Sequence, residues 1–469
     1  MSTSANRATA GQSLDKRVAP PIDPAWWGLR GVTLFAVVLL PTVFNPHRSD
    51  VFAPIKAVVL EAVVIAAAVC WWLLDAPPHA AGTRLPRLVP IGISLAIVGL
   101  FAGWVNSPIR GAEWWGEPGQ LQGLATSLLI LALIPLSAAA HRHVLDLVVT
   151  LEVVSLGSLA VSIYALVQWL GFDPVWGELS GGRVFSSLGQ ANALGAYLVL
   201  GAIVSAGAAW ITSGLRRATH VVSAGASLAA LALTMSRGGY FAFTTGAGWF
   251  GASLLFARGQ RDGWPHRPAQ LTGRRLAAIA LAASLAVVFG ARRVMASVAN
   301  RATSIRHLGA DESIYQHEAL WRAATAMIVD HPGVGLGPDG FATAFEAYRD
   351  RILPTKAAWQ LALFRPESPH NQPLARFVDG GLPAGVGYLL LWLGGIVLLV
   401  SRARRVEAVE RTAVLIVSAA LMAHLVATLF ITGELASDAV AAVLLGGAMI
   451  CVGSGKARPR RPSILVDSA

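Results

Sequence analysis

The stretch LGQANALGAYLVLGAIVSAGAAWITS, residues 188–213, decides the fold class of this chain. It contains no Asp, Glu, Lys or Arg, and it is longer than the roughly 20 apolar residues that an α-helix needs to cross a bilayer. The whole chain has the same character, with 55% hydrophobic and 13% charged residues, against about 25% charged in soluble domains. This composition excludes a soluble globular enzyme, a disordered chain and a disulfide scaffold.

Apolar runs of similar length recur along the chain and predict about twelve membrane-spanning helices. The predicted fold class is therefore all-α, a polytopic membrane protein. The predicted spans are residues 28–45, 51–74, 88–105, 121–140, 144–170, 188–213, 218–236, 239–257, 275–295, 373–400, 411–431 and 434–453.

The net charge is +11, from 37 Lys and Arg against 26 Asp and Glu. The basic residues fall between the apolar runs, which indicates membrane topology and contact with anionic lipid and argues against nucleic acid. Basic residues crowd one alternating set of loops, and this set includes the terminal tails 1–27 and 454–469. The positive-inside rule predicts that both tails are cytoplasmic. Residues 28–295 then hold the first nine spans, and residues 373–453 hold the last three.

One connection, residues 296–372, is long and hydrophilic, and the charge pattern puts it on the outer side of the membrane. Loops of this length in compact proteins are usually functional. Its first half predicts an amphipathic helix, with Leu320, Ala324 and Met327 on one face, that ends at Pro332. Such a helix suits the bilayer surface or the mouth of a cavity. A packing lid without chemistry is the alternative.

A second loop helix is predicted to start at Pro338 and to align Phe341, Phe345 and Tyr348. The glycines of residues 335–340 match a dinucleotide-binding G-x-G-x-x-G pattern, but they lie outside the membrane, follow no predicted strand and enclose a proline. We therefore predict that they form a tight turn between the two loop helices.

His370 and Asn371 stand side by side where the loop enters the tenth span. Pro369 and Pro373 restrict the backbone around them. Histidine, with an unperturbed pKa near 6.5, is suited to taking a proton near neutral pH. His370 is therefore a candidate general base, and the alternative is that it caps a helix end or bonds a carbonyl.

Arginines at the outer ends of spans form a second candidate group. Arg237 follows the seventh span in the sequence TMSRGG, and Arg183 lies among glycines in an outer loop. The long loop adds Arg301 and Arg306. An arginine at the edge of the hydrocarbon is costly without an anionic partner, and a guanidinium binds phosphate oxygens in pairs. These residues could hold a pyrophosphate, or they could extend to lipid headgroups.

Neither a metal nor a cofactor is indicated. The outer loops carry no D-x-D pair, and His317 and His331 do not fall at a convincing ligand spacing with carboxylates. Cys70 and Cys451 lie within apolar runs and suggest neither a disulfide nor a metal site. An enzyme that handles pyrophosphate without Mg²⁺ needs fixed cations, and the arginines supply them.

The order of these motifs resembles the O-antigen ligase/polymerase superfamily, most closely its O-antigen ligases. The resemblance rests on SRGG, then D-x-S and a tryptophan, HPGVGLG, a histidine with its asparagine, and DGGLPAG; in this chain these are residues 236–239, 311–313, Trp321, 331–337, 370–371 and 379–385. His317 stands where many relatives carry arginine. The resemblance implies a GT-C-like glycosyltransferase architecture.

The resemblance also implies the reaction. An O-antigen ligase of the bacterial inner membrane moves polysaccharide from undecaprenyl pyrophosphate onto a sugar hydroxyl of lipid A–core at the periplasmic face. Residues 296–372 would then be periplasmic, with His370 as the base of an inverting transfer. Asn371 would orient His370 or a sugar hydroxyl. Arg237 and Arg183 would bind the donor pyrophosphate.

Two alternatives remain open from the sequence. A twelve-span transporter would also carry intramembrane charge, although transporters tend to place such groups near the midplane of repeated halves. The second alternative is an O-antigen polymerase or a protein O-oligosaccharyltransferase of the same superfamily. The acceptor cannot be read from the residues, and His370 could instead donate a hydrogen bond to the phosphates.

Overall fold

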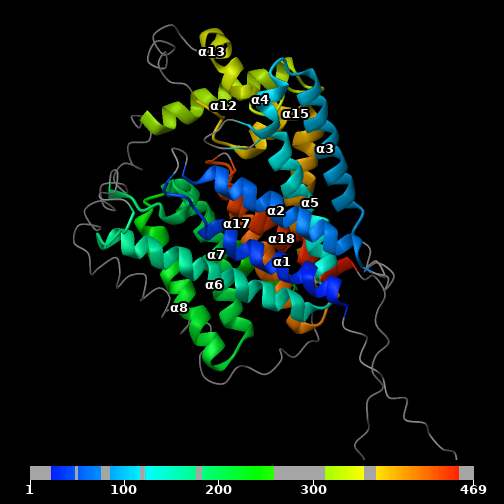
Figure 1. Ribbon diagram of the computed structural model, residues 1–469, viewed down its shortest axis with the longest axis vertical. Helices are drawn as coiled ribbons and strands as arrows, with labels where there is room; N and C mark the ends of the chain where they lie inside the picture. Colours follow the sequence, from blue (N-terminus) through cyan, green and yellow to red (C-terminus); the bar gives the residue numbers. More distant parts are fainter. Residues whose placement is uncertain are drawn as a thin grey trace, which may run out of the picture.

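The computed structural model describes residues 23–47, 51–74, 85–116, 121, 123–175, 182–257, 312–352, 366–431 and 433–453. Every regular element within these ranges is a helix (Figure 1), which confirms the all-α prediction. The helices are α1 Pro24–Thr42, α2 Ala53–Trp72, α3 Leu88–Asn106, α4 Arg110–Trp115, α5 Leu124–Ala140, α6 Val144–Trp169, η3 Ser186–Leu188, α7 Ala191–Ile211, α8 Gly214–Leu233, α9 Arg237–Ala257, α12 Glu312–Asp330, α13 Gly340–Ile352, α15 Gln372–Leu389, the π-helical turn η5 Leu390–Gly394, α16 Gly395–Ala403, α17 Ala408–Ala427 and α18 Leu435–Gly453.

The helices confirm a polytopic membrane protein. Among the described residues, 8 helices are long and apolar enough to cross a membrane, and α15, η5 and α16 together make one of them. The apolar helix α5 is shorter. Every predicted span except 275–295 falls on a described helix. Helices α8 and α9, on the predicted spans 218–236 and 239–257, are not among the eight. Residues 275–295 lie outside the described part of the chain, so the count of twelve stays a prediction.

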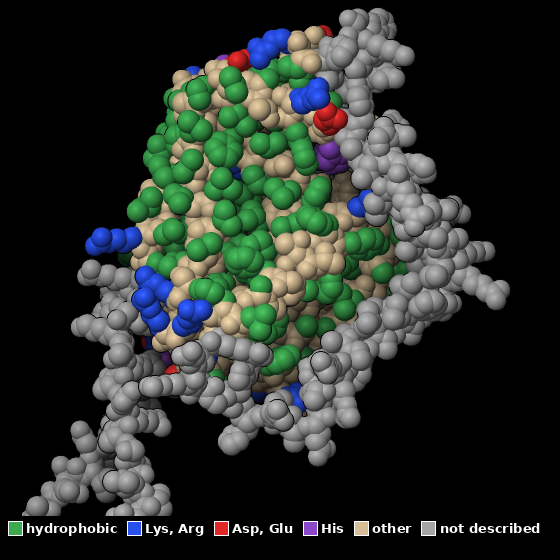
Figure 2. All heavy atoms as spheres, turned by 180° about the vertical axis from the view of Figure 1, so that it is seen from behind, with side chains coloured by type: hydrophobic (Ala, Val, Ile, Leu, Met, Phe, Trp, Pro, Cys, Tyr) green, Lys and Arg blue, Asp and Glu red, His purple; other side chains and the backbone are tan. Residues whose placement is uncertain are grey.

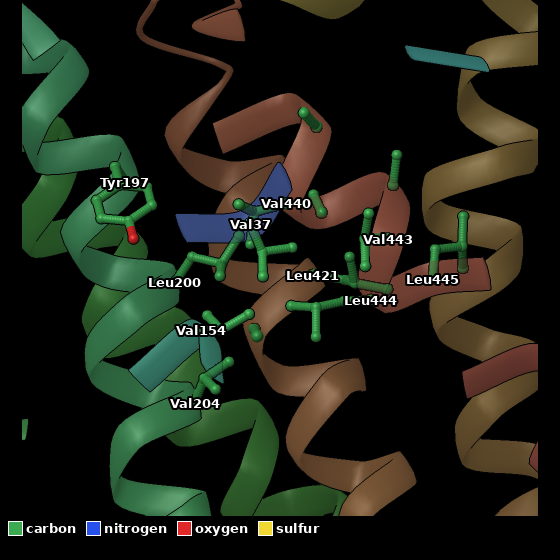
Figure 3. Packing of buried hydrophobic residues seen from close by; sticks show 14 of the residues in the cluster. Val37, Val154, Tyr197, Leu200, Val204, Leu421, Val440, Val443, Leu444 and Leu445 are labelled. Atoms are coloured by element: carbon green, nitrogen blue, oxygen red, sulfur yellow. The ribbon is translucent and has the colours of Figure 1, made fainter. Parts of the chain in front are cut away.

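Three helices form the centre of the bundle. Most residues in the most apolar stretch of each of these helices are buried: 83% in α7, 78% in α17 and 94% in α18. The corresponding share is 33% in both α2 and α3. Figure 3 shows Leu200 and Val204 of α7 packed with Leu421 of α17 and Leu444 of α18. The face seen in Figure 2 is mostly hydrophobic, with charged side chains gathered toward its two ends, as expected of a surface that meets lipid.

Helices α3 and α15 approach each other through small residues. An ideal Cβ added to Gly99 would lie 2.3 Å from the backbone nitrogen of Ala384, and one added to Gly103 would lie 2.1 Å from the carbonyl oxygen of Asp379. Small residues let membrane helices pack at this distance. Helix α15 departs from regular geometry at Gly380 and Gly381, and Gly381 has a φ of 64°. The seam therefore fixes the broken helix against α3.

We expect Gly99→Ala to destabilise the protein by about 1–3 kcal/mol, because the added methyl group must push the α15 backbone away. Thermal unfolding in detergent measures the effect. Gly248→Ala is the matched control, since a Cβ at Gly248 on α9 meets nothing within 4 Å. Equal melting temperatures for the two variants would contradict the tight seam.

The two predicted loop helices exist and share a small core. Leu320 and Met327 of α12 are buried against Phe341 and Phe345 of α13, which confirms both predicted faces. Helix α13 begins at Gly340 and not at Pro338, because Asp339 has a left-handed φ of 62° that a right-handed helix does not accept. Figure 1 shows α12, α13 and α4 at the same end of the molecule.

Candidate active site

A cavity of about 1180 Å³ lies under the loop helices. Its walls come from α12 and α13 on one side and from the ends of α7, α9 and α17 on the other. The lining combines basic side chains, the acids Glu318 and Asp330, a few uncharged polar groups and many apolar side chains. The basic residues are Arg183, Arg237, Arg322 and Arg351, and the larger apolar ones are Met235, Phe241, Trp321, Val329, Ile352, Phe430 and Ile431. The cavity can therefore accept a molecule with an anionic part and an apolar part.

Arg183 is fixed at this cavity by two hydrogen bonds. Its Nε donates to the carbonyl oxygen of Thr234 at 2.8 Å, and its Nη2 donates to Oδ1 of Asn192 at 2.8 Å. Thr234 caps the C-terminal end of α8, where a cation is stabilised by the helix dipole. The guanidinium therefore joins the outer ends of α7 and α8.

Arg237 begins α9 directly after a sharp turn. Met235 has a left-handed φ of 52°, and the hydroxyl of Ser236 accepts a hydrogen bond from the backbone N–H of Gly239 at 3.2 Å. A Cβ on Gly238 would lie 2.9 Å from Phe430, so the glycine lets the segment that follows α17 approach. The SRGG motif thus separates α8 from α9 and places Arg237 at a helix N-terminus, where an anion is also stabilised.

His370 lies in the short segment before α15 and is half-buried. Its φ of 49° is in the left-handed region, and its backbone N–H donates to the hydroxyl of Ser368 at 3.4 Å. Burial lowers the pKa of the His370 imidazole, and the neighbouring His317 lowers it further. The ring is therefore largely neutral near pH 7, which is the state that can accept a proton.

Asn371 caps α15. Its Oδ1 accepts a hydrogen bond from the backbone N–H of Leu374 at 3.1 Å, and its side chain is buried. An N-cap of this kind is typically worth about 1 kcal/mol. Asn371 therefore has a structural role as the cap of α15. Its predicted role, to orient His370 or a sugar hydroxyl, stays a prediction.

The first residues of α15 are tied to the central helices. The backbone N–H of Gln372 donates to the carbonyl oxygen of Thr428 at 2.8 Å, and its Nε2 donates to Oδ2 of Asp438 at 2.9 Å. The other carboxylate oxygen of Asp438 lies 3.2 Å from Nε2 of His424. These contacts join the ends of α15, α17 and α18 immediately after His370, so the position of His370 is set by the core of the bundle.

His317 of α12 is a site residue that was not among the predicted ones: from the sequence it was rejected as a metal ligand and noted as standing where many relatives carry arginine. Its ring centroid lies 5.9 Å from that of His370 and 6.2 Å from that of Trp321. His317, Trp321, Thr325 and Val329 all line the cavity, and their spacing of four residues puts them on one face of the helix. This spacing was a signal in the sequence, and it was overlooked because the apolar face beside it explained the helix.

The predicted site residues are brought together in part. Arg183 and Arg237 line one cavity, and His370 lies beside His317 at its wall. Arg301 and Arg306 lie outside the described residues, so their assignment stays a prediction. Among the described residues, no group of three or more His, Cys, Asp and Glu could hold a metal ion.

The rim of the cavity holds the two loop helices together. Asp330 at the end of α12 accepts hydrogen bonds from Nη1 of Arg351 at 2.6 Å and from the hydroxyl of Tyr348 at 2.8 Å, both on α13. The bonds from Arg351 and Tyr348 lower the pKa of Asp330. Because the carboxylate stays ionised, this tie persists at acidic pH.

The glycines between α12 and α13 form the predicted turn. The backbone N–H of Leu336 donates to the carbonyl oxygen of Val378 at 2.7 Å, and that of Gly337 donates to Asp379 at 3.0 Å. Gly337 has a φ of 93°, and a Cβ on it would lie 2.6 Å from the carboxylate of Glu113. The turn is therefore seated between the broken helix α15 and the short helix α4.

Glu113 should make the stability of the protein around this turn sensitive to pH. Burial, with a smaller contribution from Asp339, raises the pKa of the Glu113 carboxyl from 4.5 to about 7 against an opposing hydrogen bond from Ser107. The folded state thus favours the protonated form, and the associated stability is complete below pH 4.5 and lost as the pH rises through about 7. We expect Glu113→Gln to reduce the fall in melting temperature between pH 5 and pH 8. Parallel pH profiles of the wild type and the variant would contradict this.

Residues 222–389, about a third of the chain, match the family model described as O-Antigen ligase. The match supports membership of the O-antigen ligase superfamily. It includes Arg237, His317, the glycine turn and His370, whereas Arg183 lies before it. No curated protein matches the chain.

Membership of the superfamily indicates a glycosyltransferase-like enzyme of the ligase/polymerase type. It also implies substrates that are lipid-linked polysaccharides in general. Together with the apolar helices, it describes a multi-pass membrane enzyme.

Proposed function

We propose that the protein is an O-antigen ligase of the bacterial inner membrane. It transfers polysaccharide from undecaprenyl pyrophosphate to a sugar hydroxyl of lipid A–core on the periplasmic side, without a metal and with inversion. One observation carries the proposal: Arg183 and Arg237 line the same cavity, which has apolar walls and a pair of histidines at one edge.

The proposed chemistry follows from these groups. The acceptor hydroxyl oxygen forms a bond to the anomeric carbon as the bond from that carbon to the pyrophosphate oxygen breaks. The pyrophosphate leaves with the electron pair, and Arg237 and Arg183 stabilise its charge. Neutral His370 is the general base that receives the hydroxyl proton. The apolar wall holds the first part of the prenyl chain.

The test is the lipopolysaccharide of a cell that lacks the protein. Free core together with accumulated lipid-linked polymer supports the ligase. Core that carries a single repeat unit would indicate a polymerase, and normal lipopolysaccharide with an unglycosylated protein would indicate a protein O-oligosaccharyltransferase. Activity of the purified protein in EDTA tests the metal-free scheme.

The proposed orientation is tested by labelling with an impermeant maleimide. In a background with Cys70→Ala and Cys451→Ala, we expect Ala347→Cys on α13 to react in intact spheroplasts, because Ala347 is exposed on the periplasmic loop. The control is Val409→Cys in the first turn of α17, where Val409 is 47% exposed; this variant should react only after lysis. The reverse pattern would place α13 in the cytoplasm.

A further inference from the structure

His370 stands behind the cavity wall. As far as the described residues show, the side chains that line the cavity include His317 but not His370. The two ring centroids are 5.9 Å apart with an angle of 38° between the rings. At this separation a single water molecule can bridge a nitrogen of one ring to a nitrogen of the other. A hydroxyl bound in the cavity meets His317 first.

We propose that His317 relays the acceptor proton to His370. This proposal rests on the proposed function and adds to it a second histidine that contacts the acceptor. As the acceptor oxygen bonds to the anomeric carbon, its O–H bond breaks and the proton binds one ring nitrogen of His317. The proton on the other ring nitrogen of His317 moves to His370. His370 becomes the imidazolium ion and releases the proton to water.

The surroundings of His317 suit a relay better than a phosphate contact. Two arginines, Arg183 and Arg237, already supply fixed positive charge to the cavity. Glu318, the acid adjacent to His317, bonds Arg322 at 2.6 Å. The ring of His370 lies beside that of His317, with 5.9 Å between the centroids. A neutral imidazole carries one ring nitrogen that accepts a proton and one that donates a proton, so the ring of His317 has both groups that a relay needs.

Other charged groups stand on the elements that meet at His370. They include Glu367 on its own segment, Arg376 and Asp379 on α15, His317 and Glu318 on α12, Asp339 before α13, Arg183 and Arg237 at the cavity, and Asp438 on α18. Since His317 lowers the pKa of His370, its removal raises that pKa. The acidic limb of the remaining activity must then move to higher pH.

The experiment uses the purified full-length protein in lipid vesicles with lipid-linked polysaccharide and lipid A–core. It compares the wild type with His317→Ala, His317→Arg and His331→Ala. The last variant is the matched control, because His331 follows α12 but is exposed and is not among the residues that line the cavity. Transfer rate from pH 5 to 9, donor KM and melting temperature are measured for each variant, with and without free imidazole in the buffer.

We expect His317→Ala to lower kcat by about 10²-fold or more, with donor KM and melting temperature close to those of the wild type. Free imidazole should restore part of the rate, because it can enter the space left by the ring. His317→Arg should stay inactive, since a guanidinium does not give up its proton. His331→Ala should transfer at the wild-type rate and show no response to imidazole.

Three results would overturn the relay. They are wild-type kcat in His317→Ala, recovery of activity in His317→Arg with a change confined to donor KM, and a lower melting temperature without imidazole rescue. The first excludes a role for His317, the second makes it a phosphate contact and the third makes it structural. Failure of the wild type to use lipid A–core would contradict the proposed function instead.

Discussion

Transfer should fall by a factor of 10²–10⁴ in His370→Ala, which is the range expected when a general base is removed. Donor binding and melting temperature should change little. Alanine at 370 keeps the left-handed backbone, and the cap of Asn371 and the contacts of Gln372 remain, so the segment before α15 stays in place. The measurement is transfer rate, donor binding and thermal unfolding on the same purified variant.

The pH profile of the wild type gives an independent check. A base must be neutral, so its activity is lost as the pH falls through its pKa. Because burial and His317 lower the pKa of His370 from 6.5, the acidic midpoint should lie below 6.5. Substantial transfer in a stable His370→Ala would rule out the base role, and a joint loss of stability and donor binding would make His370 structural.

Arg237→Ala should lower kcat by roughly 10²–10³-fold, the usual cost of losing a group that stabilises charge in the transition state. Arg237→Lys should recover only part of this, because lysine keeps the charge but loses the planar fork that binds two phosphate oxygens. Steady-state kinetics with the lipid-linked donor measure both variants. Wild-type turnover in a well-folded Arg237→Ala would reduce this residue to a lipid anchor.

Arg183→Ala is the informative comparison. Arg183 also holds the carbonyl oxygen of Thr234 and the side chain of Asn192, so its removal should lower the melting temperature as well as transfer. Arg237→Ala should lower transfer with a smaller loss of stability. Equal losses of stability in the two variants would mean that Arg237 also acts mainly as a structural tie.

The helices of this chain could be predicted because each is long and apolar and because charged loops separate one helix from the next. The bundle order could not, because it depends on close approaches between distant residues. Gly99 and Ala384 are an example, since neither sequence position reveals the 2.3 Å that a Cβ would leave between them. The break in α15 was also missed, because a G-G pair within an apolar run does not by itself show a left-handed residue.

The candidate site was predictable where its chemistry sits in one short motif, as for Arg237 and His370. Arg183 lines the same cavity as Arg237 because Arg183 donates a hydrogen bond to Thr234, which lies far from it in the sequence. The sequence alone does not show this bond. His317 was missed because the apolar face of α12 accounted for the periodicity. A second, polar stripe on the same helix carries no hydrophobic signal.

The left-handed backbone of His370 has a consequence for how this protein would respond to selection. This conformation costs every residue other than glycine about 1–2 kcal/mol, whereas glycine adopts it freely. At a φ of 49°, the backbone of position 370 is therefore most stable when the residue is glycine, which has no side chain. Variants evolved for heat resistance alone should drift to glycine at this position, gaining thermal tolerance while losing the imidazole.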